Sequence, residues 1–197
     1  MDLRIGFFGD SFVNGFGDPD GLGWVGRVCV AAITRGHTVT SYNAGIRGDT
    51  STDVRARWRD EAARRLPAAQ PRGLVFAFGV NDCLSVAGHP ALLREATVAN
   101  AREILAAAKA FAPTLLIGPP PIDDKTVNAW LGDLSAAFDV LGRELAVPFL
   151  DVFDPLQLSS AWRSEITAGD GAHPGRGGYQ ALTELVNGWA AWRAWLP

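Results

Sequence analysis

Residues 3–11 read LRIGFFGDS, an apolar run that ends in a glycine and two polar residues. The run from Leu3 to Phe8 has the length and composition of a buried β-strand, and the polar residues after it break the apolar pattern. We therefore expect Ser11 to lie at the carboxyl end of this strand. Ligands of open parallel α/β sheets bind beyond the carboxyl ends of the strands, so a serine there can meet a substrate.

Short apolar runs alternate with longer helical patterns along the rest of the chain, which is typical of βαβ units and a parallel sheet. The expected strands cover residues 3–8, 38–43, 73–78, 114–118 and 147–150. The expected helices cover residues 22–35, 51–66, 91–111, 126–145 and 176–194, and irregular stretches cover 12–21, 83–90, 119–125 and 151–174. No linker or repeat interrupts this pattern, so we expect an α/β fold with a five-stranded parallel sheet and one domain over residues 1–197.

The composition narrows the class of protein. With 48% hydrophobic and 20% charged residues and a mean hydropathy of +0.07, the chain resembles a globular protein, and no apolar run approaches the roughly 20 residues of a membrane span. We expect no membrane partner and no signal peptide.

The two cysteines, Cys29 and Cys83, are far apart, which predicts neither a disulfide nor a metal site and favours the cytoplasm. A net charge of −3 argues against nucleic-acid binding, and we interpret the arginines of residues 55–65 as a solvated helix face.

A serine needs a histidine as base and an acid to orient that histidine. Of the three histidines, His37 and His89 have the surroundings of turn residues, whereas His173 lies in the segment DGAHP, between the last strand and the last helix. Asp170 precedes it by three residues and can accept the Nδ1 proton, which leaves Nε2 free to face a serine.

Two further segments supply the donors that a tetrahedral oxyanion needs. Asn81 lies in GVND after the third expected strand, and Gly48 lies in NAGIRGD after the second. A side-chain amide and a glycine N–H are suitable donors. If the strand order is the flavodoxin-like 2-1-3-4-5, the first and third strands flank the switch point, and Ser11 lies beside Asn81.

Taken together, these segments resemble the GDSL hydrolases of the SGNH superfamily. The four blocks of that family occur in order, as Gly9-Asp10-Ser11-Phe12, Gly48, Gly79-Val80-Asn81-Asp82 and Asp170-Gly171-Ala172-His173. The resemblance implies a three-layer α/β/α sandwich with no cofactor or metal. It also implies that Ser11 is the nucleophile, His173 the base and Asp170 its orienting acid, and that Ser11, Gly48 and Asn81 supply the oxyanion hole. Gly45 lies in the same block as Gly48, and we favour Gly48 because Gly-Asp-Thr-Ser follows as in bacterial members of the family.

Other residues are candidates for the substrate side or for structural roles. Phe12 stands where the family has leucine and is placed to shape the pocket, and Trp162 and Ile166 are candidates for an acyl pocket. Asp10 and Asp82 are interpreted as loop-holding residues. Cys83 is expected to be a small buried residue, Asn100 a hydrogen-bonded packing residue, and the tryptophans of the last helix a part of the core or of a dimer contact.

The resulting hypothesis is hydrolysis of a small-molecule carboxylic ester or thioester, with short acyl chains favoured, through an acyl-serine intermediate. Acetylated carbohydrates, long acyl thioesters and lysophospholipids are alternative substrates, and a non-catalytic module that binds an acylated sugar is an alternative of another class. The sequence leaves open whether the protein is a monomer or a homodimer.

Overall fold

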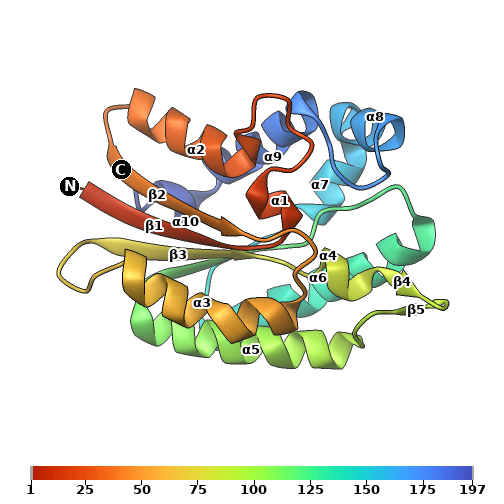
Figure 1. The fold of residues 1–197 in the computed structure, drawn as a ribbon, viewed down its shortest axis with the longest axis horizontal. Helices are drawn as coiled ribbons and strands as arrows, with labels where there is room; N and C mark the ends of the chain where they lie inside the picture. The colour runs from red at the N-terminus through yellow and green to blue at the C-terminus, as the bar shows by residue number, and fades with distance from the viewer. Residues whose placement is uncertain (1, 197) are drawn as a thin grey trace.

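The computed structural model describes residues 2–196, and five of the strands within them form one parallel sheet (Figure 1). In chain order these strands are β1 (Asp2–Gly9), β2 (Thr38–Gly45), β3 (Arg72–Ala77), β6 (Thr114–Ile117) and β7 (Phe149–Leu150). Their order across the sheet is β2-β1-β3-β6-β7, and every neighbouring pair is parallel. The predicted sheet and its order 2-1-3-4-5 are therefore confirmed.

Helices cover both faces of this sheet, as Figure 1 shows. One layer holds α2 (Gly23–Thr34), α9 (Arg176–Gly188) and the short α10 (Ala190–Arg193). The other layer holds α3 (Ser51–Arg65), α5 (Arg94–Phe111) and α6 (Lys125–Leu145). This is the three-layer α/β/α sandwich that the family resemblance implies.

The central strand β1 is buried on both faces because helices cover both of them. Phe7 packs edge-on against Trp24 of α2 at 5.6 Å between ring centroids. Phe8 points to the opposite layer, stacks on Phe76 at 5.5 Å and meets Trp58 of α3 edge-on. Both phenylalanines are completely buried, which explains why the strand is apolar at successive positions and does not alternate.

Several stretches that the sequence predicts to be irregular contain short elements. They are the helices α1 (Ser11–Asn14), α7 (Phe153–Leu158) and α8 (Ser160–Ala168) and the hairpin of β4 (Ser85–Val86) and β5 (His89–Pro90). A further short helix, α4 (Val80–Cys83), lies directly before the hairpin. Strands of two residues and helices of nine residues or fewer are too short to establish a hydrophobic period, so the sequence pattern does not reveal them.

The predicted helix over residues 176–194 is two helices. Trp189 has extended backbone, with φ −72° and ψ 125°, and separates α9 from α10. The break turns the chain so that Trp192, which is 1% exposed, packs against Phe7 at 6.1 Å. The interpretation of this tryptophan as a core residue is confirmed.

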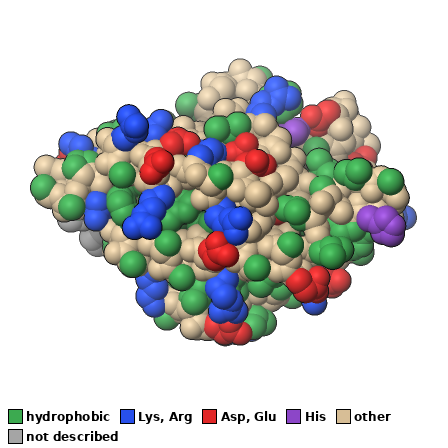
Figure 2. Space-filling view, turned by 60° about the horizontal axis from the view of Figure 1, so that its bottom comes forward, with side chains coloured by type: hydrophobic (Ala, Val, Ile, Leu, Met, Phe, Trp, Pro, Cys, Tyr) green, Lys and Arg blue, Asp and Glu red, His purple; other side chains and the backbone are tan. Residues whose placement is uncertain are grey.

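Charges of both signs are interspersed with apolar side chains on the face that Figure 2 presents, which includes α3 and α5. Arg55 on this face pairs with Glu103 of α5 at 2.9 Å, and both side chains are largely exposed. Within residues 2–196 no helix is both long enough and apolar enough to cross a membrane.

The strand ends approach one another closely at the carboxyl edge of the sheet. Gly9 pairs with Gly45 on one side and with Ala77 on the other. A Cβ on Gly9 would lie 1.8 Å from the carbonyl oxygen of Ala77, and one on Gly45 would lie 2.3 Å from the backbone nitrogen of Asn14 in α1. Both positions therefore require glycine for space, and α1 is held tightly over the ends of β1 and β2.

We predict that Gly9→Ala lowers the free energy of unfolding by about 3 kcal/mol or more, because backbone atoms must move to admit the methyl group. Gly188→Ala is the matched control, since a Cβ there meets nothing within 4 Å. The control should change stability by no more than about 1 kcal/mol. Urea unfolding of both variants provides the measurement, and equal midpoints for Gly9→Ala and the native chain would contradict the prediction.

Candidate functional site

Ser11 is the first residue of α1, directly beyond the carboxyl end of β1. The N-cap of this helix is Asp10, whose Oδ1 accepts a hydrogen bond from the N–H of Phe12 at 2.9 Å. Because Asp10 takes the capping role, the hydroxyl of Ser11 is available for another partner. The short link from strand to helix thus presents a serine side chain at the edge of the sheet.

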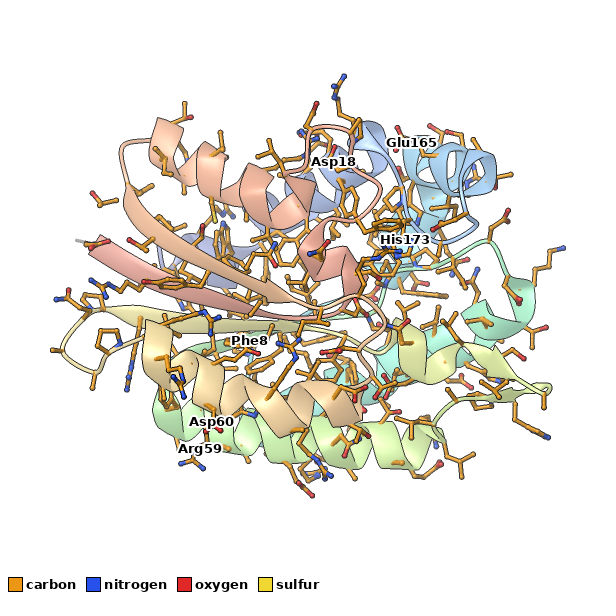
Figure 3. The ribbon with its side chains drawn as sticks, viewed as in Figure 1. Phe8, Asp18, Arg59, Asp60, Glu165 and His173 are labelled. Atoms are coloured by element: carbon orange, nitrogen blue, oxygen red, sulfur yellow. The ribbon has the colours of Figure 1, made fainter. Side chains whose placement is uncertain are left out.

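That partner is His173, whose Nε2 lies 2.7 Å from the Oγ of Ser11. On the other side of the ring, Nδ1 lies 2.7 Å from the Oδ2 of Asp170. Figure 3 shows His173 close to α1, at the side of the molecule where the strands end. The structure therefore brings together three residues separated by up to 162 positions, in the geometry that lets a histidine take a proton from a serine.

The turn from Asp170 to His173 keeps the carboxylate in place. The Oδ1 of Asp170 accepts hydrogen bonds from the N–H groups of Ala172 at 3.0 Å and of His173 at 2.8 Å. Burial raises the pKa of the Asp170 carboxyl, but the hydrogen bonds from the backbone and ring of His173 outweigh it and lower the pKa to about 2. At neutral pH Asp170 is therefore ionised and can hold the imidazole in one orientation.

Aromatic rings surround the imidazole of His173. Phe12 lies against one face, with ring centroids 4.9 Å apart and planes tilted by 30°, and Phe16 meets the ring edge-on at 4.8 Å. Trp162 stacks behind Phe12 at 6.2 Å and donates its indole N–H to the carbonyl of Pro121 at 2.9 Å. These contacts fix the plane of the imidazole.

The residues predicted for the substrate side lie behind the site. Phe12 is 4% exposed, Ile166 3% and Trp162 0%. The expectation that Trp162 and Ile166 line an acyl pocket is therefore not met in this structure, because both side chains are used in packing α8 against the core. Phe12 does shape the site, but through its contact with His173.

Of the two predicted oxyanion residues, Asn81 lies in the short helix α4 and Gly48 lies in the loop after β2. The Nδ2 of Asn81 donates a hydrogen bond to the carbonyl of Asp49 at 2.9 Å, which links α4 to the loop after β2. An amide group carries a second N–H that this bond leaves available. Gly48 precedes Asp49, is exposed and has φ +84°, a backbone conformation that side chains disfavour.

Arg57 is a site-forming residue that the sequence analysis missed. Its Nη2 donates to the carbonyl of Gly9 at 2.9 Å, its Nη1 to the carbonyl of Ala44 at 2.8 Å, and its Nε to the carboxylate of Asp49 at 2.6 Å. A second carboxylate, that of Glu61, lies 3.0 Å from Nη1. One guanidinium thus joins the ends of β1 and β2 to the loop that carries Gly48.

The basic composition of residues 55–65 concealed this role. Arg57 follows the buried Val54 by three positions and adjoins the buried Trp58, so it lies at the border of the buried face of α3. Figure 3 shows Arg59 on the far side of the same helix, away from His173. The interpretation as a solvated face is wrong for Arg57, and its spacing from Val54 was the signal that could have distinguished it.

Buried polar residues support the loops from below. Asp82 is fully buried and accepts hydrogen bonds from the backbone N–H of Ser51 at 2.9 Å and from the hydroxyl of Thr97 at 3.0 Å. Asn100 donates to the hydroxyl of Ser51 at 2.9 Å, in agreement with its predicted packing role. Cys83 is also buried, and burial raises the pKa of its thiol to about 12.

Beside His173 and Asp170 lies a cavity of about 550 Å³. Phe16 and Pro19 line it from the loop after α1, and Glu165 and Arg176 line it from α8 and α9. Among residues 2–196, no group of three or more His, Cys, Asp or Glu side chains has the arrangement to hold a metal ion.

In this structure a serine, a histidine and an aspartate form a hydrogen-bonded series at the edge of a parallel α/β sheet. This arrangement is typical of enzymes that catalyse acyl transfer. Comparison with known families agrees, since the model of the GDSL-like lipase/acylhydrolase family matches residues 7–181. The chain belongs to this family and is a GDSL esterase.

Solved structures share the fold over nearly the whole chain. A lipase/acylhydrolase from Enterococcus faecalis is 23% identical with a TM-score of 0.77, and the match covers 98% of this chain and 97% of that one. A GDSL-family lipolytic protein from Veillonella parvula is 16% identical with a TM-score of 0.76, covering 95% and 98%. An acetylxylan esterase from Geobacillus stearothermophilus is 19% identical with a TM-score of 0.72, covering 92% and 91%. No curated protein matches the chain.

The carboxyl of Asp10, next to Ser11, gives a prediction about pH. Burial raises the pKa of this carboxyl to about 7, the N–H of Phe12 works against the rise, and the negative charge of Asp82 adds to it. The folded state thus holds the proton more tightly than the unfolded state, whose pKa is near 3.8. The stabilisation from this proton is complete below pH ~4 and is lost as the pH rises to ~7.

We therefore predict that the native chain loses stability relative to Asp10→Asn as the pH rises from about 4 to about 7, because the asparagine does not titrate. Urea unfolding of both proteins across this interval measures the difference. A constant difference over the whole interval would contradict the prediction.

For Arg57 we predict that Arg57→Gln lowers the free energy of unfolding by about 3 kcal/mol, since it removes a donor from two carbonyls and two carboxylates. Arg55→Gln is the control, because Arg55 lies on the same helix with an exposed partner. That variant should lose less than about 1 kcal/mol. Denaturant unfolding compares the two, and similar losses would show that Arg57 has no special role.

Proposed function

We propose that the protein hydrolyses carboxylic esters or thioesters with short acyl chains, through an acyl-enzyme formed on Ser11. The observation that carries the proposal is the pair of 2.7 Å contacts that His173 makes, one to the hydroxyl of Ser11 and one to the carboxylate of Asp170. A serine is a weak nucleophile until a base removes its proton, and this geometry provides the base and its orientation.

In the first half of the reaction, Nε2 of His173 accepts the proton of Ser11 while Oγ attacks the carbonyl carbon of the substrate. The negative charge that develops on the carbonyl oxygen is stabilised by the N–H groups of Ser11 and Gly48 and the side-chain amide of Asn81. The N–H of Ser11 suits this role because the first N–H groups of a helix have no partner within the helix.

Collapse of the tetrahedral intermediate breaks the bond to the leaving group, and His173 returns the proton to the departing alcohol or thiol. Water then attacks the acyl-enzyme with His173 again as base, which releases the acid and restores Ser11. Asp170 stays ionised throughout and stabilises the imidazolium that forms in each half. No cofactor or metal takes part in this sequence of steps.

The packing of the aromatic residues supports a small acyl group. Phe12 and Trp162 stack on one another behind His173, so they fill space with their own rings that a long chain would otherwise occupy. An acetylxylan esterase has the same fold, and acetyl is the smallest of the candidate acyl groups. Acetylated carbohydrates therefore belong among the substrates to be tried.

A fluorophosphonate probe tests the nucleophile directly, because it reacts with an activated serine. Under the proposal the intact mass of the native chain gains one adduct, and Ser11→Ala gains none. The same variant should lose about 10⁴ to 10⁶ of kcat on a para-nitrophenyl ester. Folded native protein that takes no adduct would refute the proposal and would favour a non-catalytic module that binds acylated sugars.

Two further measurements test the proposed oxyanion donor and the length of the acyl chain. Asn81→Ala should lose about 10² to 10³ of kcat, which is the effect of removing one oxyanion donor. A series of para-nitrophenyl esters from acetyl to dodecanoyl should give the highest kcat/KM at the short end. A maximum at the long end would overturn the assignment of short acyl chains.

A further inference from the structure

Arg47 is held beside the candidate site by a contact with an aromatic ring. Its guanidinium carbon lies 3.3 Å from the centroid of the Phe16 ring, over the ring face. The residue itself is exposed and directly precedes Gly48 in the chain. Arg47 therefore lies on the same loop as Gly48, which is proposed to bind the oxyanion, and the aromatic contact limits where its side chain can go.

Phe16 in turn is fixed against the reacting groups. Its ring meets that of His173 edge-on at 4.8 Å. Its carbonyl accepts a hydrogen bond from the hydroxyl of Tyr179 at 2.7 Å, and its N–H donates to the carbonyl of Ser11 at 3.1 Å. The chain of contacts from Arg47 through Phe16 to His173 thus consists of well-anchored residues.

Arg47 differs from the other arginines around the site in having no carboxylate partner among residues 2–196. Arg57 pairs with Asp49 and Glu61. Arg27 pairs with Asp18 and Asp20, and Arg176 also pairs with Asp20. These arginines are part of the framework of the site. Arg47 is a cation whose charge the described part of the protein leaves unneutralised.

Two carboxylates of the site, those of Asp170 and Asp49, are already engaged by other cationic or ring groups. Asp170 faces the imidazole of His173, and Asp49 faces Arg57. A guanidinium stacked on a ring keeps the N–H groups of its edge available, and those groups match the geometry of a carboxylate or a phosphate. The surroundings of Arg47 therefore favour a bound anionic oxygen group.

The direction of proton transfer from His173 indicates which part of a substrate would contact Arg47. Nε2 of His173 must reach the oxygen of the leaving group to return the proton, so the alcohol part of an ester lies on the His173 side of Ser11. Phe16 contacts His173, and Arg47 contacts Phe16. An anionic substituent on the alcohol would lie within reach of the guanidinium.

We propose that Arg47 is a specificity residue that binds an anionic oxygen group, carboxylate or phosphate, on the alcohol part of the ester, so that the preferred substrates are esters of anionic alcohols. This proposal rests on the proposed ester hydrolysis at Ser11. Binding of a remote group acts equally on the bound substrate and the transition state, so Arg47 should govern KM more than kcat.

The test uses two matched pairs of butanoyl esters. The first pair is butanoyl glycolate, which presents a carboxylate, and butanoyl glycolamide, which is uncharged and has no second ester. The second pair is butanoyl glycerol phosphate and butanoyl glycerol, which presents a phosphate. For each pair the ratio of kcat/KM, charged over uncharged, is measured for the native protein, Arg47→Gln, Arg47→Lys and Arg59→Gln.

Arg59 is the matched control because it is exposed, has no carboxylate partner in the described range and lies on the side of α3 away from His173 (Figure 3). The native protein should prefer the charged ester of at least one pair, and the pair with the larger ratio identifies the group. Arg47→Gln should lower kcat/KM for that charged ester by about 10- to 100-fold through KM. The uncharged ester should change less than about threefold, Arg47→Lys should keep part of the preference, and Arg59→Gln should keep all of it.

Other outcomes overturn the inference without touching the proposed function. A native protein that prefers the uncharged ester in both pairs has no anion subsite at Arg47. Equal losses on charged and uncharged esters would mean that Arg47 only supports the loop of Gly48. By contrast, a native protein that hydrolyses no ester of either pair and takes no fluorophosphonate would remove the proposed function itself.

Discussion

The close packing at the carboxyl end of β1 is the constraint on which the rest of the site depends. Gly9 lies so near the carbonyl of Ala77 that no side chain fits, and Gly45 meets α1 in the same way. Because these glycines bring the ends of three neighbouring strands together, the chain can turn at Asp10 into a helix whose first residue is Ser11. The position of the serine hydroxyl is thus a consequence of backbone packing in the sheet.

Hydrogen bonds then join loops that are far apart in the sequence around this point. Arg57 connects the ends of β1 and β2 to Asp49, and Asn81 connects the short helix α4 to the same residue. Tyr179 of α9 holds the carbonyl of Phe16. Each of these bonds crosses between elements, so the site is rigid only when the whole sheet and both helical layers are in place.

The aromatic residues beside His173 connect this framework to the chemistry and to recognition. Phe12 lies on one face of the imidazole and is backed by Trp162, while Phe16 meets the ring edge-on. Phe16 also carries Arg47 on its face, so one ring contacts both the proposed base and the guanidinium of Arg47. In this arrangement the groups that would orient the proton transfer and those that would select the substrate share one side chain, and a change at Phe16 would affect both.

The apolar runs of the sequence were enough to predict an α/β fold with five parallel strands, and the short motifs after those strands marked Ser11, Asp170 and His173 as candidate site residues. Which side chains face the site depends on the tertiary structure. Trp162 and Ile166 are buried behind it, Arg57 turns inward from a helix rich in surface arginines, and the last helix breaks at Trp189 so that Trp192 can reach Phe7. Period and composition describe one element at a time, whereas burial and pairing depend on which other elements pack against it. For that reason the order of the main helices and strands could be predicted from the sequence, whereas the side-chain contacts of Arg57, Phe12 and Arg47 could not.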